Sequence, residues 1–162
     1  MKTLNLNIPI GVYSVEELSE TQRTLVEKAI EATENSYSPY SRFSVGACVR
    51  LDNGITVIGA NQENAAYPVG LCAERAAIFA AQSQYPTHPI THIAIAARDT
   101  SGQLLTKPVS PCGSCRQVIL EIEQRYNTNI EVILYGTEKI YVIKSVKDIL
   151  PLCFINTDME GK

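Results

Sequence analysis

Short apolar runs alternate along this chain with longer segments that carry apolar residues at helical spacing. The apolar runs predict strands at residues 43–49, 55–60, 91–97, 130–135 and 140–143. The helical segments lie at residues 15–35, at about 72–84, after Pro111, and at 145–150. Interleaved strands and helices fold as packed layers. The order of these segments therefore predicts an α/β domain with a mixed sheet.

Local signals mark the boundaries of several of these elements. Ser14-Val-Glu-Glu17 is a capping-box pattern, which predicts the start of the first helix. Asp52-Asn53-Gly54 predicts a hairpin, because Asn and Gly tolerate a positive φ. Residues 1–12 are interpreted as a loose or edge-strand lead-in. The sequence shows no repeat or linker, so we expect one domain over residues 1–162, with residues 1–13 as an N-terminal extension.

The net charge and the hydropathy of the chain argue against two classes of partner, nucleic-acid polymers and membranes. Fourteen Lys and Arg against seventeen Asp and Glu give a net charge of −3, without the basic stripe that proteins use to grip nucleic-acid polymers. No apolar run reaches the roughly 20 residues of a membrane-spanning helix. The first ten residues also lack the apolar stretch of a secretion signal. We therefore expect a cytoplasmic protein with reduced thiols, no membrane partner and no nucleic-acid polymer.

Two cysteine-bearing segments lie where a predicted loop passes into a predicted helix. They read Cys72-Ala-Glu-Arg and Pro111-Cys-Gly-Ser-Cys-Arg-Gln. Free backbone amides and the helix dipole at such positions stabilise a thiolate. Cys112 and Cys115 are one helical turn apart, and Cys72 can complete a set of three sulfurs. Thiolate ligands in tetrahedral geometry suit zinc.

The number of ligands decides what such a metal can do. Structural zinc sites normally have four protein ligands, whereas catalytic sites leave one position open for water. Three cysteines leave that position open, and Glu74 can stand beside it to move protons. Three thiolates around Zn²⁺ give a net charge of −1, which opposes ionisation of a bound water. Our hypothesis is that Arg75 and Arg116, which adjoin the cysteines in sequence, withdraw part of this charge.

Simpler interpretations of the same residues stay open at this point. Cys112-x-x-Cys115 alone also fits a thiol redox pair. A closed, non-enzymatic zinc module needs a fourth ligand, for which Cys48 and Cys153 are the spare thiols, although both fit a buried apolar role better. Glu74 alone fits a solvated carboxylate in a first helical turn. The two histidines, His88 and His92, fall outside both motifs.

Taken together, the two motifs resemble those of cytidine deaminases, in particular the small homotetrameric class with three cysteine zinc ligands. The similarity extends beyond the cysteines to three further segments, at residues 37–47, 61–67 and 150–154, and covers roughly residues 15–158. The resemblance implies a three-layer α/β/α sandwich with a five-stranded mixed sheet. It also implies one zinc ion per subunit, held by Cys72, Cys112 and Cys115. In this scheme zinc-bound hydroxide attacks C4 of the base while Glu74 shuttles protons.

The same resemblance assigns the substrate-binding residues. The Ala73 amide would hold the pyrimidine, Phe43 would stack on or flank it, and Asn61 and Glu63 would bind ribose hydroxyls. Two aromatic residues would reach into a neighbouring subunit of a homotetramer; these are Tyr67 and Phe154. The implied reaction is deamination of cytidine and 2′-deoxycytidine to uridine and 2′-deoxyuridine in pyrimidine salvage. An alternative substrate is a nucleoside antibiotic such as blasticidin S, although Phe43 and Asn61-x-Glu63 favour an ordinary nucleoside.

Overall fold

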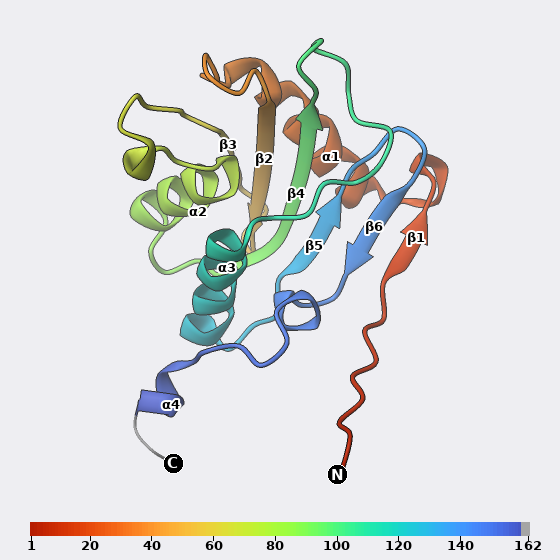
Figure 1. Ribbon diagram of the computed structural model, residues 1–162, viewed down its shortest axis with the longest axis vertical. Helices are drawn as coiled ribbons and strands as arrows, with labels where there is room; N and C mark the ends of the chain where they lie inside the picture. Colours follow the sequence, from red (N-terminus) through yellow and green to blue (C-terminus); the bar gives the residue numbers. More distant parts are fainter. Residues whose placement is uncertain (160–162) are drawn as a thin grey trace.

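The computed structural model describes residues 1–159 and shows a six-stranded sheet with helices on both faces (Figure 1). The strands are β1 (Gly11–Tyr13), β2 (Ser44–Leu51), β3 (Thr56–Ala60), β4 (Ile90–Arg98), β5 (Glu131–Leu134) and β6 (Ile140–Ile143). The longer helices are α1 (Glu20–Ala32), α2 (Ala73–Gln84) and α3 (Gly113–Tyr126), followed by the short α4 (Asn156–Met159). Four 3-10 turns complete the order: η1 (Val15–Glu17), η2 (Thr33–Asn35), η3 (Tyr67–Val69) and η4 (Val146–Ile149). The predicted domain runs to residue 162, so its end lies outside the described residues.

The sheet order is β1-β6-β5-β4-β2-β3, with β4 and β5 parallel and the other neighbours antiparallel. Successive side chains of a strand point to opposite faces. Cys48 accordingly belongs to the core beneath α1, whereas Val49 belongs to the core beneath α2 and α3. The mixed α/β/α sandwich is confirmed. None of the helices in the described part of the chain has the length and apolar character that crossing a membrane requires.

The expected strand count of five was wrong, because the N-terminal lead-in contributes a sixth strand. Residues 11–13 pair antiparallel with β6, with Gly11 opposite Val142 and Tyr13 opposite Ile140. The expectation of an edge strand in this region therefore holds for its last residues only. A three-residue strand carries too few alternating positions for periodicity to reveal it.

The helix predicted over residues 15–35 is interrupted near its start. Two capping boxes follow one another: Ser14 and Glu17 cap the start of the 3-10 turn η1, and Ser19 and Gln22 cap the start of α1. Leu18, between them, has an extended backbone and a buried side chain. The second box was the signal for this break. The short helix predicted at residues 145–150 is the 3-10 turn η4.

Close contact between α2 and β3 fixes the helix against the sheet. A Cβ atom placed on Gly59 would lie 2.4 Å from the Ala77 amide nitrogen and 2.6 Å from the Ala73 carbonyl oxygen. Only glycine allows a helix backbone to approach a strand so closely. Gly59 therefore sets the position of the first turns of α2, which carry Glu74.

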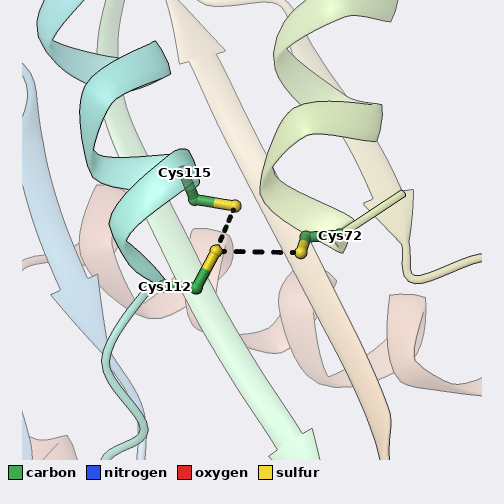
Figure 2. A group of neighbouring side chains, drawn as sticks. All are labelled: Cys72, Cys112 and Cys115. Atoms are coloured by element: carbon green, nitrogen blue, oxygen red, sulfur yellow. Dashed lines mark hydrogen bonds between the residues drawn. The ribbon is translucent and has the colours of Figure 1, made fainter. Parts of the chain in front are cut away.

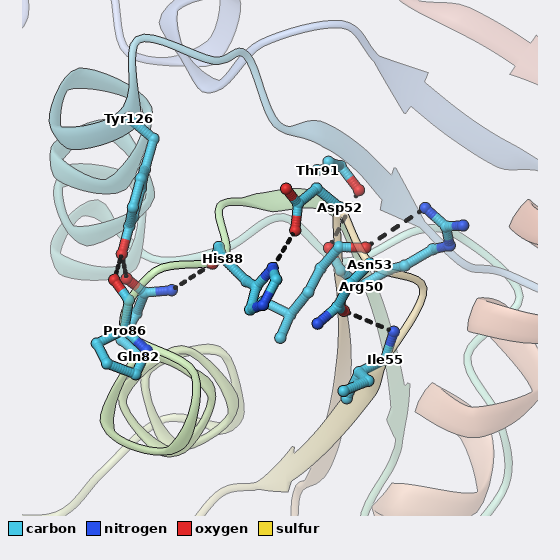
Figure 3. Close-up of polar contacts among 10 residues, drawn as sticks. Arg50, Asp52, Asn53, Ile55, Gln82, Pro86, His88, Thr91 and Tyr126 are labelled. Atoms are coloured by element: carbon cyan, nitrogen blue, oxygen red, sulfur yellow. Dashed lines mark hydrogen bonds and ion pairs between the residues drawn. The ribbon is translucent and has the colours of Figure 1, made fainter.

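The far ends of α2 and α3 are joined by hydrogen bonds, shown in Figure 3. The Tyr126 hydroxyl, at the end of α3, lies 2.5 Å from Gln82 Oε1 and 2.7 Å from the Pro86 carbonyl oxygen. His88 Nδ1 lies 2.8 Å from Asp52 Oδ1, in the predicted hairpin. Gly54 adopts a φ of 88° there, which confirms the turn expected from Asn-Gly.

Candidate metal and substrate site

Three cysteine sulfurs meet where α2 and α3 begin (Figure 2). Cys72 is the N-cap residue of α2, Cys112 is the N-cap residue of α3, and Cys115 lies in the first turn of α3. The Sγ atom of Cys112 is 3.9 Å from that of Cys72 and 3.5 Å from that of Cys115. The predicted helix starts are thus brought together, although forty residues separate them.

The spacing of the sulfurs fits a tetrahedral metal ion. A Zn–S bond of about 2.3 Å places the sulfurs of a tetrahedral site about 3.8 Å apart. All three sulfurs lie within 4.8 Å of one another, and no further metal-binding side chain joins the group among residues 1–159. Cys48 lies in the core on the α1 side of the sheet, where burial raises its pKa to about 11. The residues present therefore fit zinc with one coordination position left open.

Hydrogen bonding divides charge unevenly among the thiols. A hydrogen bond from Cys115, together with others from Arg75 and Cys112, lowers the pKa of Cys72 to about 5. The pKa of Cys115 is raised, because it donates to Cys72 and is buried. Cys72 is therefore the thiolate of the metal-free cluster, which prepares it to bind a cation.

The two arginines beside the cysteines have different contacts. Arg75 Nη2 lies 3.5 Å from the Cys72 sulfur, as the charge-withdrawal hypothesis requires. Its Nε atom is buried and has no hydrogen-bond partner within residues 1–159. Arg116 instead donates to the backbone carbonyls of Pro111, at 2.8 Å, and Ile149, at 2.7 Å. No hydrogen bond joins Arg116 to a sulfur within residues 1–159, so the charge-withdrawal hypothesis gains support for Arg75 but none for Arg116.

Glu74 lies in the first turn of α2 and is 5% exposed. Burial raises its pKa, and the negative charge of the Cys72 thiolate adds to this effect. A backbone hydrogen bond at the helix start acts in the opposite direction but does not outweigh burial. A carboxyl group with a raised pKa can exchange protons near neutral pH, which is the property of a general acid and base. The interpretation of Glu74 as a solvated carboxylate does not fit this burial.

A pocket of about 290 Å³ opens beside the sulfurs. Its walls contain seven residues that the sequence singled out: Phe43, Asn61, Glu63, Cys72, Ala73, Glu74 and Cys112. Sequence reasoning missed four others: Ser41, Val45, Val109 and Ser110. Val109 and Ser110 directly precede the Pro111 motif, and this adjacency was the available signal. The pocket combines apolar walls with a few polar groups, as small-molecule sites do.

Asn61 holds the rim of this pocket together. Its Oδ1 accepts hydrogen bonds from Ser36 Oγ, at 2.6 Å, and from the Val45 amide, at 2.8 Å. Its Nδ2 donates to the Phe43 carbonyl at 2.9 Å. A carboxamide has two donor hydrogens and two acceptor lone pairs. One N–H of Asn61 is left for a ligand, which is less than the sequence suggested.

Glu63 lines the pocket and is bound by backbone amides of the segment that precedes Phe43. Its Oε2 accepts from the amides of Tyr40, at 2.9 Å, and Ser41, at 3.2 Å. These bonds, with one from the Ser41 side chain, lower its pKa, so the group is a carboxylate. An ionised carboxylate in the pocket wall can accept a hydrogen bond from a hydroxyl.

The two aromatic residues expected to act across subunits lie outside this pocket. Tyr67 is 74% exposed and packs edge-on against Tyr40, with ring centroids 5.8 Å apart. It lines an adjoining pocket of about 350 Å³ that also includes Cys72 and Arg75. Phe154 is 59% exposed, and its carbonyl accepts a hydrogen bond from Gln117. Their action on a neighbouring subunit stays a prediction.

A family model, curated relatives and solved structures all match this chain to one protein family. Residues 19–129 match the family model of the cytidine and deoxycytidylate deaminase zinc-binding region. The chain is 38% identical over 139 residues to a cytidine deaminase of Halalkalibacterium halodurans, covering 86% of this chain and 98% of that protein. A cytidine deaminase of Sporosarcina psychrophila is 38% identical over 136 residues, which are 84% of this chain and 93% of that one. The crystal structure of a Burkholderia pseudomallei cytidine deaminase is 34% identical with a TM-score of 0.71, covering 85% of this chain and 100% of that one.

Proposed function

The chain belongs to the cytidine deaminase family, and from that premise we propose that it converts cytidine and 2′-deoxycytidine to uridine and 2′-deoxyuridine in pyrimidine salvage. One observation carries the proposal. Three sulfurs at tetrahedral spacing lie beside a buried carboxyl group, and both border a pocket that the Glu63 carboxylate also lines.

Cys72, Cys112 and Cys115 would hold one zinc ion in each subunit. When bound, zinc would make a water molecule nucleophilic at neutral pH. Arg75 would offset part of the negative charge of the three thiolates through its contact with Cys72. This contact reduces the electrostatic difficulty that a site with three thiolates presents.

Glu74 would carry the protons of the reaction. Water and cytidine give uridine and ammonia, so both protons of the water must leave its oxygen, one to reach ring N3 and the other to reach the departing amine. A single carboxyl group can perform these transfers in turn if its pKa lies near the working pH. Burial raises the pKa of Glu74 in that direction, and the carboxyl lies in the same pocket as Cys72.

The pocket walls would select a nucleoside. Phe43, Val45 and Val109 supply apolar surface for the base, and the Ala73 amide would hold its polar edge. Glu63 Oε1 would accept a hydrogen bond from a ribose hydroxyl, while the remaining N–H of Asn61 would donate one. The lowered pKa of Glu63 keeps that acceptor ionised.

A homotetramer would complete the site with residues from neighbouring subunits. The exposure of Tyr67 and Phe154 supports this arrangement, because large aromatic side chains are usually covered. We expect small nucleosides rather than nucleic-acid polymers as substrates, and a cytoplasmic location. Sedimentation equilibrium tests the assembly against four times the chain mass of 17.8 kDa.

The decisive test follows cytidine by ultraviolet absorbance and measures ammonia release. Glu74→Gln should lower kcat by about 10²- to 10⁴-fold, because it removes the general acid and base but no metal ligand. Glu121→Gln, which changes an exposed carboxylate on α3, is the matched control and should retain activity. Normal turnover in Glu74→Gln would contradict the proposed mechanism. A wild-type enzyme that deaminates blasticidin S and leaves cytidine unchanged would contradict the proposed substrate.

A further inference from the structure

The first twelve residues carry an apolar stripe that the described chain leaves exposed. Large apolar side chains occupy every even position from 4 to 12: Leu4, Leu6, Ile8, Ile10 and Val12. All are exposed, from 39% for Ile8 to 74% for Leu4. In an extended segment, even positions share one face. Figure 1 shows residues 1–10 running as an extended segment away from the sheet.

This segment continues an open edge of the sheet. β1 is the last strand in the sheet order and pairs with β6 alone. Since Gly11 lies opposite Val142 and β6 ends at Ile143, residues 1–9 have no neighbouring strand within the described chain. Edge strands are usually protected by charged side chains. Between residues 3 and 15 there is no Asp, Glu, Lys or Arg, so this edge lacks such protection.

We propose that residues 4–12 pair antiparallel with the same residues of a second copy of this chain, across a two-fold axis at Ile8. This register places Leu4 opposite Val12 of the second copy and Leu6 opposite Ile10. It is the register that pairs all five apolar side chains on one face. A shift by two residues in either direction leaves one of them unpaired.

Two observations favour a second copy as the partner. An open strand edge binds another polypeptide backbone, and a two-fold axis requires a surface that matches itself. The even-numbered stripe meets that requirement, because apolar residues face apolar residues throughout. Pro9, which has no amide hydrogen, suits a strand with one open side. Residues 4–9 have such a side, because β6 does not reach them.

The arm formed by residues 1–12 lies outside the region that matches the family. The family model begins at residue 19, and the Burkholderia structure is covered completely while 85% of this chain is matched. The pairing is thus independent of the proposed deaminase activity. A pair of short strands buries less than the roughly 1,200 Å² of a typical stable interface. Association through the arm should therefore depend on protein concentration.

The test compares two full-length variants with the wild type. Leu6→Ser with Ile8→Ser removes the centre of the stripe, whereas Asn5→Ser with Asn7→Ser changes the opposite face and is the matched control. Sedimentation velocity over a wide concentration range should show wild-type species of larger mass than the assembly formed by the first variant. The dissociation constant of that variant should be at least about tenfold weaker, since several cross-strand pairs are lost. The control should behave as the wild type does.

Hydrogen exchange of residues 4–12 provides the second measurement. The wild-type amides should become protected as concentration rises, and those of Leu6→Ser with Ile8→Ser should stay unprotected. Thermal melting of both variants checks that the folded core is intact. Equal masses for wild type and stripe variant would overturn the proposal. Protection that does not depend on concentration would also overturn it, because the arm would then be covered by its own chain or within the proposed tetramer.

Discussion

The starts of α2 and α3 meet at the sulfur cluster but are held in place by different means. The first turn of α2 rests directly on β3, so closely that a Cβ on Gly59 would lie 2.4 Å from the Ala77 nitrogen. At the start of α3, by contrast, a Cβ on Gly113 would meet no atom of a neighbouring element within 4 Å. This helix start is held by the Arg116 side chain, which binds the Pro111 and Ile149 carbonyls.

The two helix starts also carry different residues of the candidate site. The start in close backbone contact with β3 carries Glu74. The start bound by the Arg116 side chain carries two of the three sulfurs. A bound metal can itself draw those sulfurs into place, because metal binding contributes to folding energy. Backbone packing thus supports Glu74, and a side chain supports Cys112 and Cys115.

The largest expected effect comes from removing a ligand on the α3 side. Cys112→Ser replaces a thiolate with a poor zinc ligand, so we expect metal loss and a fall in activity of about 10³-fold or more. Elemental analysis of zinc and the cytidine assay measure both effects. Cys48→Ser is the control and should retain zinc, since Cys48 lies on the other side of the sheet. Loss of zinc in the control would indicate a closed site with four ligands.

Substituting each of the two arginines tests whether Arg75 affects zinc affinity while Arg116 affects folding stability. Arg75→Gln should weaken zinc affinity by about 10- to 100-fold, because Arg75 contacts a sulfur, and should change folding stability little. Arg116→Gln should lower the free energy of unfolding by about 1–3 kcal/mol, because two carbonyls lose their charged donor. Chelator competition measures affinity, and chemical denaturation measures stability. If both variants changed the same quantity equally, the distinction between the two arginines would be wrong.

A pair of glycine variants addresses the backbone contact. Gly59→Ala should destabilise the fold by about 1–3 kcal/mol, since the new methyl group must displace α2. Gly113→Ala has room for its methyl group and should be neutral or stabilise by up to about 1 kcal/mol. Thermal melting gives both values. Equal melting temperatures for the two variants would show that α2 does not depend on this contact.

The smallest effect concerns thiol reactivity in the metal-free protein. The pKa of Cys72 is lowered to about 5, whereas burial raises that of Cys48 to about 11. At neutral pH, Cys72 is therefore a thiolate and Cys48 a thiol, so iodoacetamide should modify Cys72 first. The reactivity of Cys72 should fall as the pH drops below about 5. Peptide mass spectrometry after brief labelling measures the order, and faster labelling of Cys48 would contradict it.

The sequence predicted those parts of the molecule that depend on local spacing. Cys72, Cys112 and Cys115 follow from helix starts and a turn of helix, and the structure brings their sulfurs together. Contacts set by the tertiary fold were beyond such reasoning. Arg116 adjoins a cysteine in sequence, yet the Ile149 carbonyl, 33 residues away, holds it. Asn61 was predicted as a ligand-binding group, but backbone and side-chain partners occupy most of its hydrogen-bonding capacity.

The hydrogen bonds at Tyr126 have a consequence for the protein without its metal. They tie the last turns of α2 and α3 together through Gln82, at the ends opposite the cysteines. At the opposite ends of the same helices, the three cysteine sulfurs already lie within 4.8 Å of one another without an ion. Chelation should therefore leave the two helices joined at Tyr126. The emptied protein would then stay ready to reload, without having to fold again from the beginning.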